Sequence, residues 1–229
     1  MSRDIESIIF LAGLGAPIAI YNDFIQLLRD QIPHKTFHTL EWWQQQDFGS
    51  KELAGFLQDK HSILIGHSAG GSIALNALAH SPESIQRVIM LDSHTLKGMN
   101  KLPSIESFLA ILLSQDSHEV IERVGEAYQL VVNDPAQFDR ALLFVSAWVK
   151  DDLAQVFAKI ESMDTHTVLH IASTDAHYKM LDEENKKEVM RFWSQHRIDA
   201  ECIPMTHFDL IMPDHASSIV KAISRWLDA

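Results

Sequence analysis

A glycine-flanked serine constrains the fold of this chain more than any other feature of its sequence. The G-x-S-x-G motif at residues 66–70 lies between a short apolar run and a helix-forming stretch. A serine on a sharp turn from strand to helix sits in strained backbone, so the residues two positions before and after it must be small. Gly66 and Gly70 meet this demand. The motif therefore predicts a strand, a tight turn and a helix, with the Ser68 hydroxyl presented at the turn.

Short β-branched runs alternate with amphipathic helical stretches along the rest of the chain. This alternation is typical of the α/β class, in which a mostly parallel central sheet is flanked by helices. The clearest helix is the last one, because the apolar positions of residues 219–227 share one face. We predict a single domain over residues 1–229, since α/β folds often reach about 200–250 residues. The expected strands are residues 7–12, 36–40, 62–65, 87–91, 167–172 and 200–203.

One interval interrupts the alternation, because about 70 residues without a convincing strand separate the fourth expected strand from the fifth. Its composition favours helices. These helices are either ordinary core helices or a lid, at about residues 97–163, over a site at the strand ends. Under the second interpretation a lipophilic pocket would be lined by Phe108, Leu109, Leu112, Leu113, Phe144 and Trp148.

The charge balance and the cysteine content exclude several classes of protein. The 31 acidic and 19 basic residues give a formal charge of −12, which argues against a nucleic-acid partner. The single cysteine, Cys202, excludes an internal disulfide and a zinc site built from cysteines. The chain shows neither a secretory signal nor an apolar run long enough to span a membrane. We therefore expect a cytoplasmic protein with no metal and no membrane partner.

A serine hydroxyl is a weak nucleophile unless a base accepts its proton, so a histidine must lie close to it. His207 fits best, because it follows the last expected strand, where this architecture supplies the base. His215 begins the C-terminal helix and is expected to be a capping or surface residue. His67 is expected to pack or to contact substrate, and His166 and His170 to be structural groups near a strand.

Two further kinds of group are needed beside the serine and the histidine. A carboxylate must hold the imidazole in its reactive tautomer, and N–H donors must stabilise an oxyanion. Asp92 and Asp175 each follow an expected strand, and spacing alone does not choose between them. We expect the oxyanion donors to be the Ala69 amide, at the start of the helix, and the Gly13 amide, in the loop after the first strand.

These residues and their surroundings resemble the α/β-hydrolase thioesterases of nonribosomal peptide and polyketide assembly lines. The likeness runs over nearly the whole chain and implies an α/β-hydrolase fold with a helical lid insertion. In the chain-terminating members, which this sequence resembles most, the acid follows the strand after the motif helix, which implies Asp92. The stand-alone editing members place it one strand later, which corresponds to Asp175. The matching segments are residues 10–15 with Tyr21, 66–74, 88–93 and 206–208.

The resemblance also implies a reaction. The substrate would be an acyl or peptidyl group held as a thioester on the phosphopantetheine arm of a carrier protein, and the enzyme itself would need no cofactor. Ser68 would attack the thioester, His207 would transfer the proton, and water or an internal nucleophile would release the acyl group. Because such carrier proteins are usually acidic, this acidic chain would dock through a local basic patch or through apolar contacts.

Two other functions remain compatible with the same residues. A general carboxylesterase or lipase-like hydrolase acting on a free small ester would use the same three groups. A ligand-binding protein that keeps the fold without catalysis is disfavoured, because the serine, a plausible base and two acids are all present.

Overall fold

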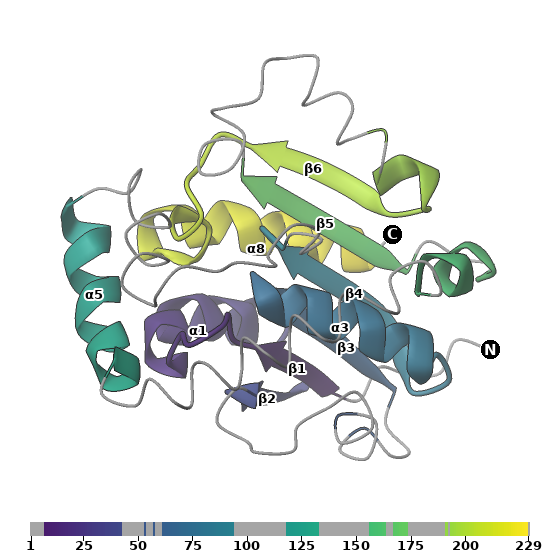
Figure 1. Cartoon of the computed structure of the whole chain (residues 1–229), viewed down its shortest axis with the longest axis horizontal. Helices are drawn as coiled ribbons and strands as arrows, with labels where there is room; N and C mark the ends of the chain where they lie inside the picture. Colours follow the sequence, from purple (N-terminus) through teal and green to yellow (C-terminus); the bar gives the residue numbers. More distant parts are fainter. Residues whose placement is uncertain are drawn as a thin grey trace.

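In the part of the chain that the structure describes, six parallel strands form one sheet in the order β2-β1-β3-β4-β5-β6 (Figure 1). The strands are β1 (Ser7–Leu11), β2 (Thr36–Leu40), β3 (Ser62–His67), β4 (Ile85–Leu91), β5 (Val168–Ser173) and β6 (Asp199–Ile203). The structure is a computed structural model that describes residues 7–42, 53, 57, 61–93, 118–132, 156–163, 167–173, 191 and 193–228. All six strands predicted from the sequence are confirmed, with ends that differ by at most two residues. The α/β class is therefore confirmed.

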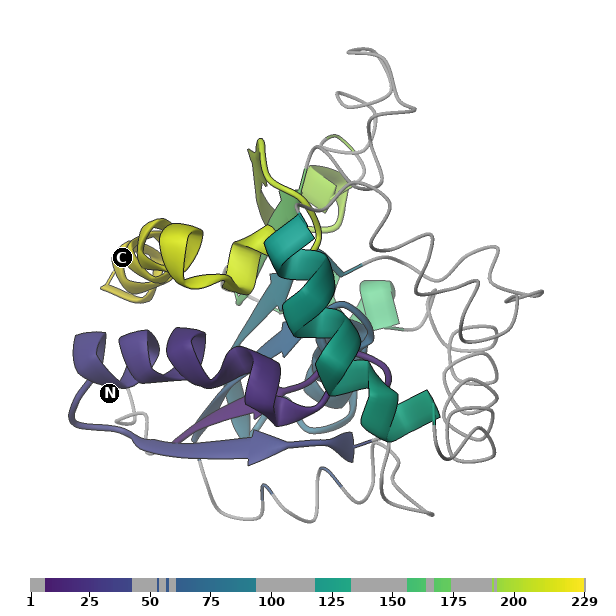
Figure 2. The same cartoon turned by 90° about the vertical axis from the view of Figure 1, so that its left-hand side faces the viewer.

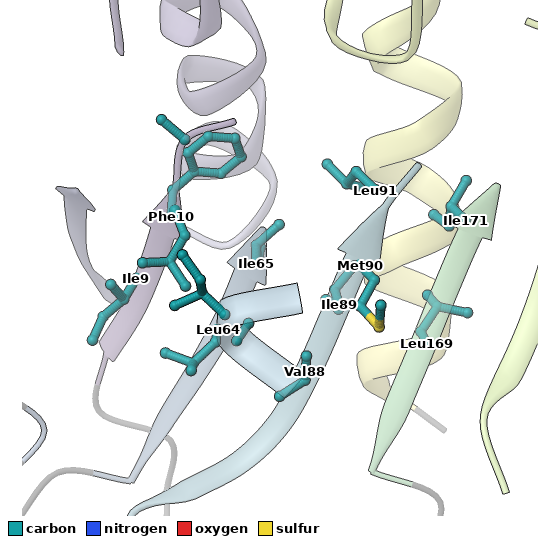
Figure 3. Close-up of a cluster of buried hydrophobic side chains, with 14 of the residues drawn as sticks. Ile9, Phe10, Leu64, Ile65, Val88, Ile89, Met90, Leu91, Leu169 and Ile171 are labelled. Carbon is teal, nitrogen blue, oxygen red and sulfur yellow. The ribbon is translucent and has the colours of Figure 1, made fainter. Parts of the chain in front are cut away.

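The central strands carry the core because both of their faces are covered. In a parallel sheet of this kind the buried strands have nearly continuous apolar runs, and every residue of β1, β3 and β5 is buried. Figure 3 shows isoleucine, leucine, valine and phenylalanine side chains of adjacent strands packing side by side. The edge strands β2 and β6 are only partly buried, so their sequences are more polar.

Helices cover the two faces of the sheet. Helix α3 (Ala69–His80) packs on β3 and β4, whereas α1 (Asn22–Gln31) and α8 (Pro213–Asp228) pack against each other on the opposite face (Figure 2). Helix α8 buries Ile219, Val220 and Ile223, as its apolar stripe predicts. None of the helices in the described ranges is long and apolar enough to cross a bilayer.

The strand order reverses its direction between β1 and β3. The chain moves outward from β1 to β2, then returns to β3 on the other side of β1 and continues through β4 to β6. Ligands of open α/β sheets bind at such a point, where the strand order reverses. The loop after β1 and the serine turn after β3 both lie there.

Part of the interval in which the sequence predicts a lid lies near the carboxyl ends of the strands. Helix α5 (His118–Val132) stands on the side toward which the strand arrows point (Figure 1). It contacts the short 3-10 helix η1 (Ile18–Tyr21), and Arg123 forms an ion pair with Asp23 at 2.7 Å. Residues 156–161 are also helical. The remaining parts of the interval 97–163, including all six residues expected to line a pocket, lie outside the described residues.

Candidate active site

Ser68 occupies a sharp turn between β3 and α3. Its backbone angles are φ 55° and ψ −124°, a left-handed conformation that a residue other than glycine rarely adopts. The Ser68 amide donates a hydrogen bond to the Leu91 carbonyl at 2.8 Å, which fixes the turn to β4. Residues 62–71 are buried except for Ser68, which is partly exposed. The turn thus has the strained geometry that the motif predicts.

Glycines make this turn possible because no side chain fits around it. A Cβ at Gly66 would lie 2.3 Å from the Gly70 backbone carbon, and a Cβ at Gly70 would lie 2.3 Å from the Leu11 carbonyl oxygen. Gly71 belongs to the same set, since its Cβ would lie 1.8 Å from Ser93 Oγ. The spacing of the motif predicts this demand only for Gly66 and Gly70. The doubled glycine at 70–71 was the available signal for the third.

A buried carboxylate and imidazole meet beside this turn. Asp92 Oδ2 lies 2.6 Å from His207 Nδ1, and the two side chains are 0% and 1% exposed. The other carboxylate oxygen, Oδ1, accepts a hydrogen bond from the Ser173 amide at 2.8 Å. Because a carboxylate only accepts, Nδ1 carries a hydrogen, and in the neutral ring Nε2 is then the basic nitrogen. This is the tautomer that a general base of this kind requires.

Local structure delivers the two partners from different strands. Asp92 follows β4 with φ 43°, and its amide donates to the Ile171 carbonyl of β5 at 2.8 Å. His207 lies in the loop between β6 and the 3-10 helix η3 (Asp209–Ile211). Within that loop the Thr206 and Asp209 side chains each accept a hydrogen bond from the other residue's amide, both at 3.2 Å. The loop is therefore braced locally as well as by its contact with Asp92.

The other candidates occupy different places. Asp175 and His166 lie outside the described residues, so no geometry distinguishes Asp175 from Asp92 directly. His215 is exposed on α8, whereas His170 is buried on β5 with its ring centroid 4.5 Å from that of Trp193. Neither histidine is part of the Asp92–His207 pair. Among the described residues, no group of three or more histidine, cysteine, aspartate or glutamate side chains could hold a metal ion.

The loop after β1 lies against the serine turn, and the amide of its first glycine, Gly13, already donates a hydrogen bond. A Cβ at Gly13 would lie 3.3 Å from that of Ser68, so the two segments are in close contact. The Gly13 amide donates a hydrogen bond to Tyr21 Oη at 3.0 Å. We expected this amide to bind an oxyanion. An oxyanion would have to share this N–H with Tyr21 Oη or replace it as the acceptor, so the role of the Gly13 amide as an oxyanion donor stays a prediction.

Ala69 is the other residue whose amide is predicted to donate to an oxyanion. It is the first residue of α3, directly after Ser68. The first amides of a helix have no acceptor within the helix, and the helix dipole adds positive potential there. An oxygen that becomes negative beside Ser68 would be stabilised by both effects.

Comparisons with known proteins identify the fold. No family model and no curated protein matches the sequence. Among solved structures, the chain is similar to 1H-3-hydroxy-4-oxoquinoline 2,4-dioxygenase, with a TM-score of 0.70, 16% identity, and coverage of 97% of this chain and 92% of that chain. A carboxylesterase of the ammonia-oxidizing thaumarchaeon Nitrososphaera gargenis gives a TM-score of 0.64 at 14% identity, covering 98% and 90%. The NocB thioesterase domain gives 0.58 at 15% identity, covering 97% and 94%. The chain has the α/β-hydrolase fold.

Proposed function

We propose that the chain is a serine hydrolase that cleaves an acyl bond through an acyl-Ser68 intermediate. The observation that carries the proposal is the buried Asp92–His207 pair, which orients the imidazole at the carboxyl ends of the strands, where Ser68 occupies its strained turn. Such a turn followed by a helix, together with an oriented histidine, is the arrangement used to activate a serine.

In the proposed reaction His207 Nε2 accepts the Ser68 proton as the serine oxygen attacks the substrate carbonyl carbon. The carbonyl oxygen becomes an oxyanion that the Ala69 amide stabilises. Collapse of this intermediate expels the leaving group, which takes the proton from His207, and the acyl group stays on Ser68. Water then attacks the acyl carbon, again with His207 as base, and releases the carboxylic acid. Asp92 stabilises the imidazolium in both halves.

For the substrate, we propose an acyl or peptidyl thioester on the phosphopantetheine of a carrier protein. Support comes from the resemblance described above and from the similarity to a thioesterase domain among the solved structures. The competing substrate is a free small ester, for which the similarity to a carboxylesterase speaks. Both substrates would use the same three residues, so delivery of the acyl group distinguishes them.

One experiment compares the two substrates directly. The same acyl group is offered as a thioester on a phosphopantetheinylated carrier protein and as a simple ester, and kcat/KM is measured for each. The thioesterase proposal predicts a much higher value on the carrier protein, and a higher value on the simple ester would overturn it. Labelling with a fluorophosphonate followed by peptide mapping tests the serine hydrolase proposal separately, because the label should be found on Ser68 and on no other residue.

A further inference from the structure

The imidazole of His67, inside the serine motif, is hydrogen-bonded at both of its nitrogens. The residue is 1% exposed. Its Nδ1 lies 3.0 Å from Tyr21 Oη, and its Nε2 lies 3.0 Å from the His207 carbonyl oxygen. Tyr21 Oη also accepts a hydrogen bond from the Gly13 amide at 3.0 Å. One chain of hydrogen bonds therefore connects the loop after β1, the serine turn and the loop of His207.

The chemistry of these groups fixes where each proton lies. A carbonyl oxygen only accepts, so His67 Nε2 must carry a hydrogen. In the neutral ring Nδ1 is then an acceptor and receives the Tyr21 hydroxyl proton, while the tyrosine oxygen accepts the Gly13 amide. Every contact in the chain is satisfied by this one arrangement. A charged ring in so buried a place would carry a large desolvation cost, which also favours the neutral form.

His67 also contacts the side chain of His207. The two ring centroids are 4.4 Å apart with the planes tilted by 41°, and the ring of Phe208 packs 5.7 Å from that of His67. His207 is therefore held at two points, by His67 at its backbone carbonyl and ring face and by Asp92 at Nδ1. Together these contacts leave little freedom for the imidazole to rotate or for its backbone to move away.

We propose that His67 is a positioning residue, which sets the place of His207 through its carbonyl, and that Tyr21 holds His67 in the Nε2–H tautomer. His67 acts through another residue and needs no contact with substrate. Its kinetic consequence rests on the proposed function, because His207 must be the base for its position to affect turnover. The tautomer of His67 does not depend on any activity.

A pair of substitutions tests the kinetic consequence. His67→Phe keeps a ring of similar size but removes the donor, and misplacing a catalytic group by about 1 Å can cost on the order of 10²-fold. We expect kcat to fall by about 10- to 100-fold with KM changed less than about threefold. His67→Gln places an amide donor near the Nε2 position and should recover most of kcat. Wild-type kcat in His67→Phe, or no recovery in His67→Gln, would overturn the proposal.

A matched control separates positioning from general damage. His80→Phe makes the same change at an exposed histidine at the end of α3 and should leave kcat and KM unchanged. Thermal unfolding shows whether each variant is folded. If His67→Phe does not fold, Tyr21→Phe provides the kinetic test, since it removes the hydroxyl that holds the His67 tautomer. Its kcat should then fall, and an unchanged value would overturn the role of Tyr21.

The tautomer is tested in the wild-type protein without substrate. Long-range 1H–15N correlation spectra distinguish protonated from unprotonated imidazole nitrogens, and loss of one set of signals in His67→Gln assigns the ring. We expect a neutral His67 with hydrogen on Nε2. Hydrogen on Nδ1, or on both nitrogens, would overturn the proposal. Failure of Ser68 labelling, by contrast, would overturn the proposed function and leave this result intact.

Discussion

The two halves of the candidate site are built in different ways. The nucleophile turn, residues 66–71, is shaped by exclusion, since three glycines leave no room for a Cβ and force the chain into one path. The histidine loop, residues 204–209, is shaped by polar contacts to Asp92, to His67 and within the loop itself. One half is therefore specified by local sequence, and the other by partners distant along the chain.

This difference predicts how each half responds to substitution. Close packing around the nucleophile turn makes its backbone intolerant of added atoms, so substitutions that add a side chain at its glycines should affect stability first. The histidine loop depends on the orientation of a few donors and acceptors, so substitutions that remove a contact of His207 should affect catalysis more than stability. The four predictions below test this contrast.

The largest effect is expected for Ser68→Ala. Removal of the nucleophile should lower kcat by about 10⁴-fold or more, because no other group can form the acyl intermediate. The fold should survive, because Ser68 is partly exposed and the hydrogen bond from its backbone amide to the Leu91 carbonyl does not involve the side chain. Steady-state kinetics and thermal unfolding measure the two effects. Ser217→Ala, at an exposed position of α8, is the control, and residual wild-type turnover in Ser68→Ala would contradict the assignment.

Asp92→Asn should come next, with a loss of about 10³- to 10⁴-fold in kcat. Asp92 accepts two N–H groups, from Ser173 and His207, whereas asparagine has one oxygen, so one N–H must face an NH₂ group. The proper tautomer of His207 is then no longer enforced. Asp214→Asn, at an exposed position of α8, serves as the control. Asp175→Asn should cost far less activity, and an equal or larger loss there would move the acid to Asp175.

Gly66→Ala should act on stability. The added methyl would lie 2.3 Å from backbone atoms of Gly70 and Gly71, and backbone cannot move aside as a flexible side chain can. We expect the free energy of unfolding to fall by about 3 kcal/mol or more, measured by urea denaturation. Gly125→Ala is the matched control, because a Cβ there meets nothing within 4 Å and should stabilise helix α5 by about 0.5–1 kcal/mol. Equal effects of the two substitutions would contradict this account.

Thr206→Val should have the smallest effect. It removes the hydroxyl that accepts the Asp209 amide at 3.2 Å and leaves the contacts of His207 with Asp92 and His67 in place. We expect the free energy of unfolding to fall by about 1 kcal/mol and kcat to change less than in His67→Phe. A loss of stability as large as that of Gly66→Ala would show that the histidine loop is packed as tightly as the nucleophile turn. Ser218→Ala, which removes an exposed hydroxyl on α8, is the control.

The strands and the nucleophile turn were predictable from sequence because their causes are local. Apolar runs bounded by turn residues located all six strands, and the spacing of Gly66 and Gly70 located the strained serine. The position of His207 after the last strand also followed from chain order. For the acid, the sequence offered two aspartates, and the structure shows Asp92 bonded to His207.

The polar links between segments were not predictable. Tyr21 and His67 are 46 positions apart, and His67 and the His207 carbonyl are 140 apart, so no local pattern reports their contact. Gly13 and Tyr21 are only 8 positions apart, but their hydrogen bond still depends on where η1 places the tyrosine. A glycine demands space at its own position, whereas a hydrogen bond depends on where another segment comes to lie.

The separation of Asp92 and His207 along the chain has a consequence for refolding. The pair closes a loop of 115 residues, and the entropic cost of closure must be met before that contact contributes any stability. Parallel sheets, with many such long-range pairings, form slowly. Recovery of activity after dilution from denaturant should therefore follow the slowest and least local step of refolding, and should lag behind the return of helical signal.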